Sequence, residues 1–409
     1  MLDVLVLGAG PAGAALAARL LQRGVRDFAV LERYRFPRDK PCGGGLTGHA
    51  DEAFAQLGLA LRVPAVAAHA ATVRVGGFTR EVTMQRPVNV VRRIDFDADL
   101  VAQARERGAE ILEGEGATAL VVRADAVEVT TTAGRTLRAR VVVGADGVAS
   151  IVRRHLRANR RELPHRLFMQ ELDGVRPAGL GDAMVYDFSC MPDAVRGYLW
   201  LFPAPGGRCN VGIMHYPSDR RGGAWLTDKL RRGLAHWGVE LPAKGARGWP
   251  AYGYEPRAPV AAPRLLTIGD AAGIDGLTGE GIAVAMEQAI LAGDEIAAAL
   301  RSGDLSFAGF GRKLRRAVIG RELTLDRRLA SLLYQRGERW REWMSLVLFD
   351  PDMLSMYAAR VSGGEVLADQ RWRLLRALGR HVRHRGARRR RLEEALAAPR
   401  RASLTPPAP

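Results

Sequence analysis

Two glycine-rich turns carry the residue types and spacing best suited to chemistry in this chain. One apolar run leads into Gly8-Ala9-Gly10-Pro11-Ala12-Gly13, and another leads into Gly269-Asp270-Ala271-Ala272-Gly273. In the first turn, glycine suits a tight bend at position 8, close approach of backbone to a pyrophosphate at 10, and helix–strand packing at 13. This turn, Ala12 included, is therefore expected to face the phosphates of a dinucleotide from the positive end of a helix.

The elements around these turns must position a ligand. The first turn follows a buried strand at 4–7 and precedes a small-residue helix at 14–21. The next strand, 28–31, ends at Glu32-Arg33, at the spacing where a carboxylate accepts hydrogen bonds from an adenosine ribose. Asp270 also follows a strand, so it is expected at the carboxyl edge of the sheet, where it suits the ribityl hydroxyls of a flavin. Together the two turns predict that the chain binds FAD.

Three further stretches extend the predicted site. Gly279-Glu280-Gly281-Ile282 opens a predicted helix over 279–300, with Glu280 in its first turn, and the positive end of that helix would favour flavin reduction. Asp146 lies in Gly144-Ala145-Asp146-Gly147, a second loop at a strand end, ahead of Ser150 and Arg153. Arg93 begins another predicted helix and is expected to reach a phosphate.

An aromatic segment and a cysteine are the candidates for the reacting end of the site. Alternation along a strand places Tyr198, Trp200 and Phe202 on one face, in a chain with only 6% aromatic residues. Such a face either lines a tunnel for an apolar chain or packs a core. Cys42, in the glycine-rich segment 36–45, is either a proton donor or a small packing residue.

Composition narrows the class of protein. The chain has 409 residues with 47% hydrophobic content, enough for two or three domains, and no apolar run of about 18 residues that would suggest a membrane span. Its three cysteines, Cys42, Cys190 and Cys209, show neither metal-site spacing nor a disulfide framework. No metal is expected, and a reducing cytoplasm fits best.

The net charge of +17 is concentrated near the C-terminus. Residues 371–401 hold twelve arginines and two glutamates. No nucleic-acid-binding motif accompanies them, so no nucleic-acid partner is expected. One interpretation is a basic surface that contacts anionic lipid headgroups at the inner face of a membrane; the other is a solvated face that reflects GC-rich coding.

The order of these motifs resembles the flavoprotein superfamily of p-hydroxybenzoate hydroxylase over roughly residues 1–310. Within it, the chain is similar to the geranylgeranyl reductase family. Three stretches carry that closer resemblance: Lys40-Pro41-Cys42-Gly43-Gly44-Gly45, Tyr198-Leu199-Trp200-Leu201-Phe202-Pro203 ahead of Asn210-Val211-Gly212, and Leu277-Thr278-Gly279-Glu280-Gly281-Ile282. The chain departs from the family in the loop from Asp270 to Gly281, which is one residue shorter and has Gly276 where proline is usual.

The resemblance implies an α/β fold in three parts. They are a Rossmann-like FAD-binding domain, an inserted α+β substrate domain with an antiparallel sheet, and a helical C-terminal region. The expected boundaries are 1–70, 91–165 and 256–305 for the FAD-binding domain, 71–90 and 166–255 for the substrate domain, 306–395 for the helical region, and 396–409 for a disordered tail. Within these parts we expect helices near 49–58, 95–107 and 221–237, and a hairpin around Gly76-Gly77.

The resemblance also implies an activity. Family members saturate C=C bonds of isoprenoid chains with reduced FAD, so the expected partner is a prenyl-chain small molecule or lipid. It assigns Cys42 to the flavin side, Tyr198, Trp200 and Phe202 to the aromatic motif, and Gly43, Ala117, Gly281 and Ile282 to backbone contacts with FAD. A flavin monooxygenase or halogenase of the same fold is the alternative, since halogenases have a similar aromatic motif. NAD(P)H, ferredoxin and a quinol all stay open as electron donors, so a reductant protein is one of the partners considered.

Overall fold

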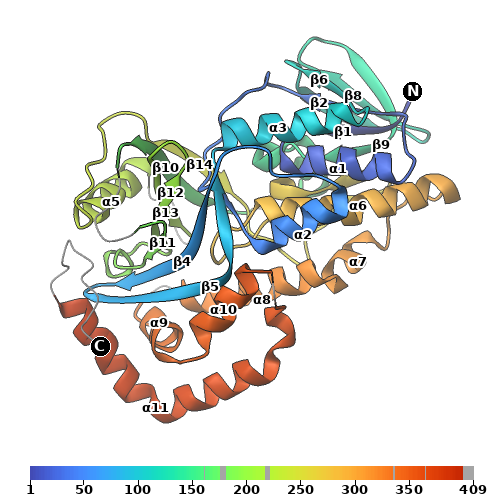
Figure 1. Cartoon of the computed structure of the whole chain (residues 1–409). Helices are drawn as coiled ribbons and strands as arrows, with labels where there is room; N and C mark the ends of the chain where they lie inside the picture. The colour runs from blue at the N-terminus through green and yellow to red at the C-terminus, as the bar shows by residue number, and fades with distance from the viewer. Residues whose placement is uncertain (161, 176–180, 217–221, 335–336, 364, 399–409) are drawn as a thin grey trace.

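The computed structural model describes residues 1–160, 162–175, 181–216, 222–334, 337–363 and 365–398. Two eight-stranded sheets lie side by side, and a group of C-terminal helices packs below the second sheet in the view of Figure 1. The α/β fold expected from the sequence is confirmed.

The first sheet is a parallel sheet with an antiparallel extension. Its main path runs β15-β16-β9-β1-β2-β6; the pairs from β16 to β6 are parallel, and β7 and β8 attach to β9 as an antiparallel hairpin. The strands are β1 (Leu2–Leu7), β2 (Phe28–Glu32), β6 (Glu110–Glu113), β7 (Ala117–Val122), β8 (Val127–Thr131), β9 (Thr136–Gly144), β15 (Ala261–Ala262) and β16 (Leu265–Thr267).

Both faces of this sheet are covered, so its central strands are apolar throughout. Along β1, Val4 and Val6 pack into the core beneath the helices, while Leu5 and Leu7 face the core on the other side. Helix α1 packs between α3 and α6, as Figure 1 shows. The helices of this region are α1 (Pro11–Gln22), α2 (Gly48–Leu57), α3 (Arg93–Glu106), α4 (Ile151–Leu156) and α6 (Ile282–Ser302).

The second sheet runs β14-β10-β13-β12-β11-β4-β5-β3. It was expected to be antiparallel; β11 and β4 are instead parallel, because the chain enters them from the same end after a long crossover. Its elements are β3 (Gly45–Leu46), β4 (Ala65–Val75), β5 (Phe78–Val91), β10 (His165–Asp173), β11 (Met184–Asp187), β12 (Leu199–Ala204), β13 (Arg208–His215), β14 (Arg247–Ala251) and the covering helix α5 (Gly223–Ala235).

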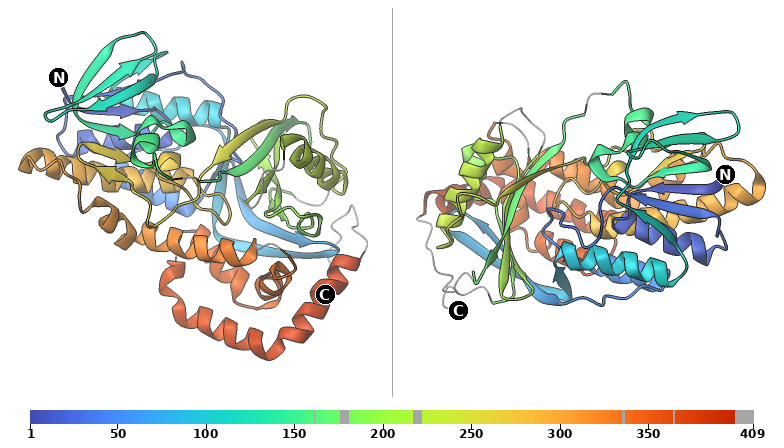
Figure 2. Two further views of the ribbon diagram at one scale, coloured as in Figure 1. Left: turned by 180° about the vertical axis from the view of Figure 1, so that it is seen from behind. Right: turned by 90° about the horizontal axis from the view of Figure 1, so that it is seen from above.

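The C-terminal helices cover the face of the second sheet that α5 leaves free. Buried side chains of α8 to α10, Trp340 and Met344 among them, share one core with Trp200 of the sheet. Helix α11 forms the outer edge of the molecule in Figures 1 and 2. The helices are α7 (Phe310–Arg316), α8 (Val318–Leu333), α9 (Trp340–Phe349), α10 (Met353–Val361) and α11 (Arg371–Ala397).

Most expected elements are present, with two corrections. The hairpin around Gly76-Gly77 is β4–β5. The helix expected from residue 279 begins only at Ile282, because the Asp275 carboxylate accepts hydrogen bonds from the backbone of the preceding loop; Glu280 therefore precedes the helix. Of the expected disordered tail, 396 and 397 belong to α11, and 399–409 lie outside the described residues. The domain boundaries stay a prediction.

Candidate functional site

A pocket of about 520 Å³ opens at the carboxyl edge of the first sheet. We call it the flavin pocket. Of the residues predicted to bind the cofactor, only Gly13 does not line it. The lining includes Gly8, Gly10, Ala12, Glu32, Arg33, Cys42, Gly43, Arg93, Ala117, Asp146, Asp270, Gly279, Gly281 and Ile282.

The three glycines of the first turn have separable tasks. Gly8 has a φ of +98°, and a Cβ there would lie 2.5 Å from the carbonyl oxygen of Ala145. A Cβ at Gly13 would lie 1.9 Å from the Gly8 carbonyl oxygen, so Gly13 serves helix packing rather than ligand contact. At Gly10 a Cβ would meet only the Arg38 guanidinium, at 3.4 Å. The pocket is thus open where a pyrophosphate would approach the positive end of α1.

Glu32 is held in place by backbone groups. Its two carboxylate oxygens accept hydrogen bonds from the amides of Ala9 at 2.9 Å and Tyr34 at 3.0 Å. A carboxylate has about four acceptor positions, which leaves capacity for ribose hydroxyls. Arg38, which the sequence did not single out, lies 3.8 Å from Glu32 and 3.1 Å from Asp97 and brings positive charge to this end of the pocket.

Asp270 forms an ion pair that the sequence did not reveal. Lys40 Nζ lies 2.9 Å from Asp270 Oδ2, although 230 positions separate them in the chain. Burial works to raise the pKa of Asp270, but the charge and hydrogen bond of Lys40 outweigh it and hold the pKa below its ordinary value. The carboxylate is therefore ionised and available to a ligand hydroxyl.

The second loop contributes an orphaned acceptor. Asp146 Oδ2 accepts a hydrogen bond from the Ile151 amide at 3.1 Å, whereas its buried Oδ1 has no partner. Burial raises the pKa of this carboxyl group. Such an oxygen in a pocket is a fitting partner for a cofactor hydroxyl. Ser150 and Arg153 instead stabilise the loops: Ser150 accepts from the Arg153 amide, and Arg153 donates to the Ala271 carbonyl at 2.8 Å.

Arg93 is bound to its own helix. Its Nε and Nη2 donate to Asp97 at 2.6 and 2.7 Å, and the guanidinium is buried. Burial works to lower the pKa of Arg93, but Asp97 and the adjacent Cys42 sulfur raise it. Arg93 thus lies beside Cys42, and its predicted contact with a phosphate stays a prediction. Half-buried Cys42 is on the pocket wall, with its sulfur 3.4 Å from the Gly44 amide.

The aromatic face predicted by alternation is present. Tyr198, Trp200 and Phe202 point into the core between the second sheet and the C-terminal helices, while Leu199 and Leu201 pack on the other side of the sheet. Ring centroids of Tyr198 and Trp200 are 6.2 Å apart, and those of Trp200 and Phe202 6.3 Å. A Cβ at Gly43 would lie 3.0 Å from Phe202, so this face contacts the wall of the flavin pocket.

Strand β11 and the residue that follows it add two rings that the sequence did not single out. Tyr186 lies 5.2 Å from Phe202 and 5.4 Å from Tyr198, between ring centroids, and Phe188 lies 5.5 Å from Tyr198. The antiparallel pairing of β11 with β12, which sets Tyr186 opposite Trp200, brings them beside the motif. Segment 184–188 carries the same alternation as 198–202, a signal that could have indicated them.

A second cavity, of about 310 Å³, lies between this sheet and the C-terminal helices. We call it the apolar cavity. Nearly all of its lining is aliphatic or aromatic, with Tyr186 and Phe188 from the sheet and Leu333, Leu354 and Leu378 among the helical contributions. Thr278 lines this cavity and the next residue, Gly279, lines the flavin pocket. A single loop and the aromatic rings therefore separate the two spaces.

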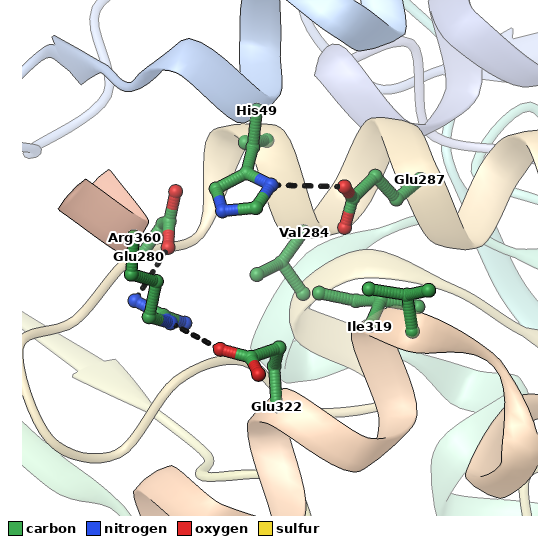
Figure 3. A pocket seen from close by; sticks show the side chains of 9 residues that line it. His49, Glu280, Val284, Glu287, Ile319, Glu322 and Arg360 are labelled. Carbon is green, nitrogen blue, oxygen red and sulfur yellow. Dashed lines mark hydrogen bonds and ion pairs between the residues drawn. The ribbon is translucent and has the colours of Figure 1, made fainter. Parts of the chain in front are cut away.

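A buried ionic cluster lies behind that loop, as Figure 3 shows. Arg360 Nη1 lies 3.4 Å from Glu280, and Nε donates to Glu322 at 2.6 Å. His49 Nδ1 is 3.4 Å from Glu287. Burial works to lower the pKa of His49, but the hydrogen bond to Glu287 and the charges of Glu280 and Glu287 raise it to about 9. Burial raises the pKa of Glu287.

The described part of the chain has neither a metal-binding cluster nor a membrane-spanning helix. Residues 1–160, 162–175, 181–216, 222–334, 337–363 and 365–398 contain no group of His, Cys, Asp and Glu arranged to hold a metal ion. In the same part of the chain, every helix is too short or too polar to cross a membrane.

Comparison with known proteins agrees with this geometry. Residues 1–175 match the family model described as an FAD binding domain. A menaquinone reductase of Mycobacterium tuberculosis is 32% identical over 371 residues, covering 81% of this chain and 84% of that protein. Digeranylgeranylglycerophospholipid reductase 2 of Methanothermobacter thermautotrophicus is 26% identical over 399 residues, covering 90% and 96%.

Solved structures share the fold. A geranylgeranyl bacteriochlorophyll reductase-like protein from Thermoplasma acidophilum superposes with a TM-score of 0.68 at 20% identity, covering 96% of this chain and 99% of its own. The halogenase PltM gives 0.70 at 15% identity, covering 97% and 95%. The cofactor of this fold and site is FAD. The chain is an FAD-dependent oxidoreductase and belongs to the geranylgeranyl reductase family.

Proposed function

We propose that this protein reduces C=C bonds of an isoprenoid chain, carried by a geranylgeranyl lipid or a prenyl quinone. The observation that carries the proposal is the apolar cavity behind the wall of the flavin pocket. A flexible hydrocarbon gains binding free energy in such a space by burying apolar surface. The names of the two curated relatives describe reduction of a menaquinone and of a digeranylgeranylglycerophospholipid.

The residues between the two spaces have complementary tasks in this proposal. Bound reduced FAD supplies the hydride. Tyr198, Trp200 and Phe202 hold a prenyl segment across the flavin and exclude water. Cys42, on the pocket wall beside Arg93, holds the proton that the second carbon needs. The positive end of α6 stabilises negative charge that develops on the flavin pyrimidine edge.

The test is product analysis under anaerobic conditions. The protein with bound FAD is first reduced by dithionite, so the test does not depend on whether NAD(P)H, ferredoxin or a quinol is the electron donor. The reduced protein is then given geranylgeraniol or menaquinone. Reduction adds two hydrogens to the product for each bond. The proposal is overturned if no prenyl compound reoxidises the flavin and if the protein, in air, transfers oxygen or halogen to an aromatic substrate. Monooxygenase or halogenase chemistry would then replace it.

We also propose peripheral contact with an anionic membrane through α11. Trp372, Leu375, Leu378 and Val382 are exposed at steps of three, three and four residues, which places them on one helix face; Trp372 and Val382 are 67% and 77% exposed. The exposed arginines Arg376 and Arg383 flank this face and have no carboxylate partner among the described residues. An apolar stripe bordered by arginines suits an anionic lipid interface.

Helix α11 also connects that surface with the apolar cavity. Leu378 is exposed and at the same time lines the cavity. Leu374, one turn earlier, also lines the cavity. A prenyl chain that leaves a bilayer at α11 would therefore reach the cavity without crossing water.

A further inference from the structure

The loop between the two spaces is held by the C-terminal helices. Tyr334, directly after α8, donates a hydrogen bond from its hydroxyl to the Leu277 carbonyl at 2.7 Å. On α10, the Tyr357 hydroxyl lies 2.5 Å from Thr278 Oγ1. Tyr334 is buried and Tyr357 is half-buried. The loop that borders the flavin pocket therefore takes two of its side-chain contacts from outside the FAD-binding part of the fold.

Arg360 adds a third contact one turn after Tyr357. It is 1% exposed and is held from two sides, by Glu322 at 2.6 Å and Asp326 at 2.7 Å on α8. Its Nη1, which has no hydrogen-bond partner, faces Glu280 at 3.4 Å (Figure 3). The guanidinium thereby fixes the position of Glu280 relative to both helices.

Glu280 transmits this constraint to the flavin pocket. Its side chain points away from the pocket, into the ionic cluster, and also accepts a hydrogen bond from Thr47. Its neighbours on both sides, Gly279 and Gly281, line the pocket. A shift of Glu280 must therefore move the backbone that borders the flavin.

The same two helices form a wall of the apolar cavity. Leu333 and Tyr334 contribute from the end of α8, and Leu354, Tyr357 and Val361 from α10. Tyr357 thus touches the cavity with its ring and the loop with its hydroxyl. A ligand that fills the cavity contacts the elements that hold the flavin loop.

We propose that Tyr357 and Arg360 are positioning residues that couple occupancy of the apolar cavity to the state of the flavin. A hydrocarbon in the cavity orders α10, and α10 then fixes Thr278 and Glu280 at the flavin edge. By linkage, the hydrocarbon must then bind to the oxidised protein and to the reduced protein with different affinities. The inference rests on the proposed function in that it names a prenyl chain as the occupant.

The test is the flavin midpoint potential of the protein with bound FAD, with and without phytanol. Phytanol is a saturated prenyl alcohol, so it fills the cavity without being reduced. In the wild type we expect its affinity for the two redox states to differ at least about fivefold, which is about 20 mV for a two-electron couple. In Tyr357→Phe and Glu280→Gln the difference should fall below about twofold. Glu280→Gln keeps an oxygen that can accept the Thr47 hydrogen bond and removes the negative charge that faces Arg360.

Tyr216→Phe is the matched control, because this ring packs against Tyr334, 5.7 Å away between centroids, and its hydroxyl makes no hydrogen bond to the loop in the part of the chain that the structure describes. It should keep the wild-type shift. A phytanol shift that persists unchanged in both variants assigns them a merely structural role and overturns the inference. No shift in the wild type overturns it as well, while reduction of geranylgeraniol by the same protein would leave the proposed function intact. A shift that the variants lose, without any prenyl reduction, supports the coupling and overturns the proposed function.

Discussion

Asn210 donates a hydrogen bond from Nδ2 to the backbone carbonyl of Cys42 at 2.8 Å, across 168 positions of the chain. The same side chain accepts a hydrogen bond from Trp200 Nε1 at 2.8 Å. One amide therefore ties the aromatic face to the cysteine loop. Two residues on from it, a Cβ at Gly212 would lie 2.1 Å from the Trp200 ring, so glycine there makes room for the indole.

Asn210→Ala should disorder the contact between aromatic face and cysteine loop. It leaves the Trp200 N–H and the Cys42 carbonyl without partners, which costs about 1–3 kcal/mol of unfolding free energy. The fall in turnover should exceed what the loss of folded protein accounts for, because both groups lie at the predicted reacting end of the site. Denaturant titration and product formation measure the two effects. A fall in product formation that matches the loss of folded protein would mean that Asn210 serves stability alone.

Cys42→Ser should affect chemistry more than folding. The thiol is half-buried on the pocket wall and has no disulfide partner, so the hydroxyl fits the same space. We expect FAD content and Tm near those of the wild type and a loss or redistribution of reduced products. Cys209→Ser, at a buried thiol on β13, is the comparison. Unfolding of Cys42→Ser would favour the packing interpretation.

Asp270→Ala should weaken FAD retention. The variant removes an ionised acceptor predicted to hold the ribityl chain, a contact of roughly 1.5–3 kcal/mol, and leaves Lys40 unpaired. Lys40→Met separates the two effects, because it removes the pair and keeps the carboxylate. FAD dissociation constants, from flavin fluorescence on dilution, should rise about tenfold or more for Asp270→Ala. Equal increases in both variants would assign the effect to the ion pair rather than to ligand contact.

His49 should make stability depend on pH above neutrality. Its pKa is raised to about 9 in the folded protein, against an ordinary value of 6.5. The stabilisation is complete below about 6.5 and is lost as the pH rises through about 9, with a total of about 1–3 kcal/mol. Denaturant titrations across this window should show the decline, and His49→Gln should flatten it. The same slope in the variant would assign the titration to another group.

Binding of α11 to anionic membranes should need both its arginines and its apolar stripe. Replacing Arg376 and Arg383 with Gln removes about 2 kcal/mol, roughly thirtyfold in affinity for vesicles that contain phosphatidylglycerol. Replacing Trp372, Leu375 and Val382 with Gln should abolish membrane insertion at unchanged charge. Val121→Gln with Val122→Gln, at exposed valines on β7, is the control.

Co-sedimentation with phosphatidylcholine vesicles, with and without phosphatidylglycerol, measures these affinities. Equal binding to both vesicle types, or binding that salt does not weaken, contradicts an electrostatic contribution and indicates that the arginines form only a solvated face.

Those parts of the site whose signals are local follow from the amino-acid sequence alone. The turn from Gly8 to Gly13 indicates its ligand because strand, glycines and helix are consecutive in the chain, and Gly13 makes room for the Gly8 carbonyl within the same turn. The aromatic face follows equally from alternation along a single strand. The start of α6 was placed too early, because the Asp275 carboxylate accepts hydrogen bonds from the loop amides of Leu277 and Thr278, a contact that spacing does not reveal.

Tertiary structure decided the contacts between residues far apart in the chain. The pairs Lys40–Asp270, Asn210–Cys42 and Arg360–Glu280 depend on how the two sheets and the C-terminal helices pack. The arginine-rich segment shows the same division. Its charge is a property of composition, whereas the exposed stripe containing Trp372 exists because the opposite face of α11 is buried against the protein. Which face of a helix meets solvent is set by its neighbours, and periodicity alone cannot assign it.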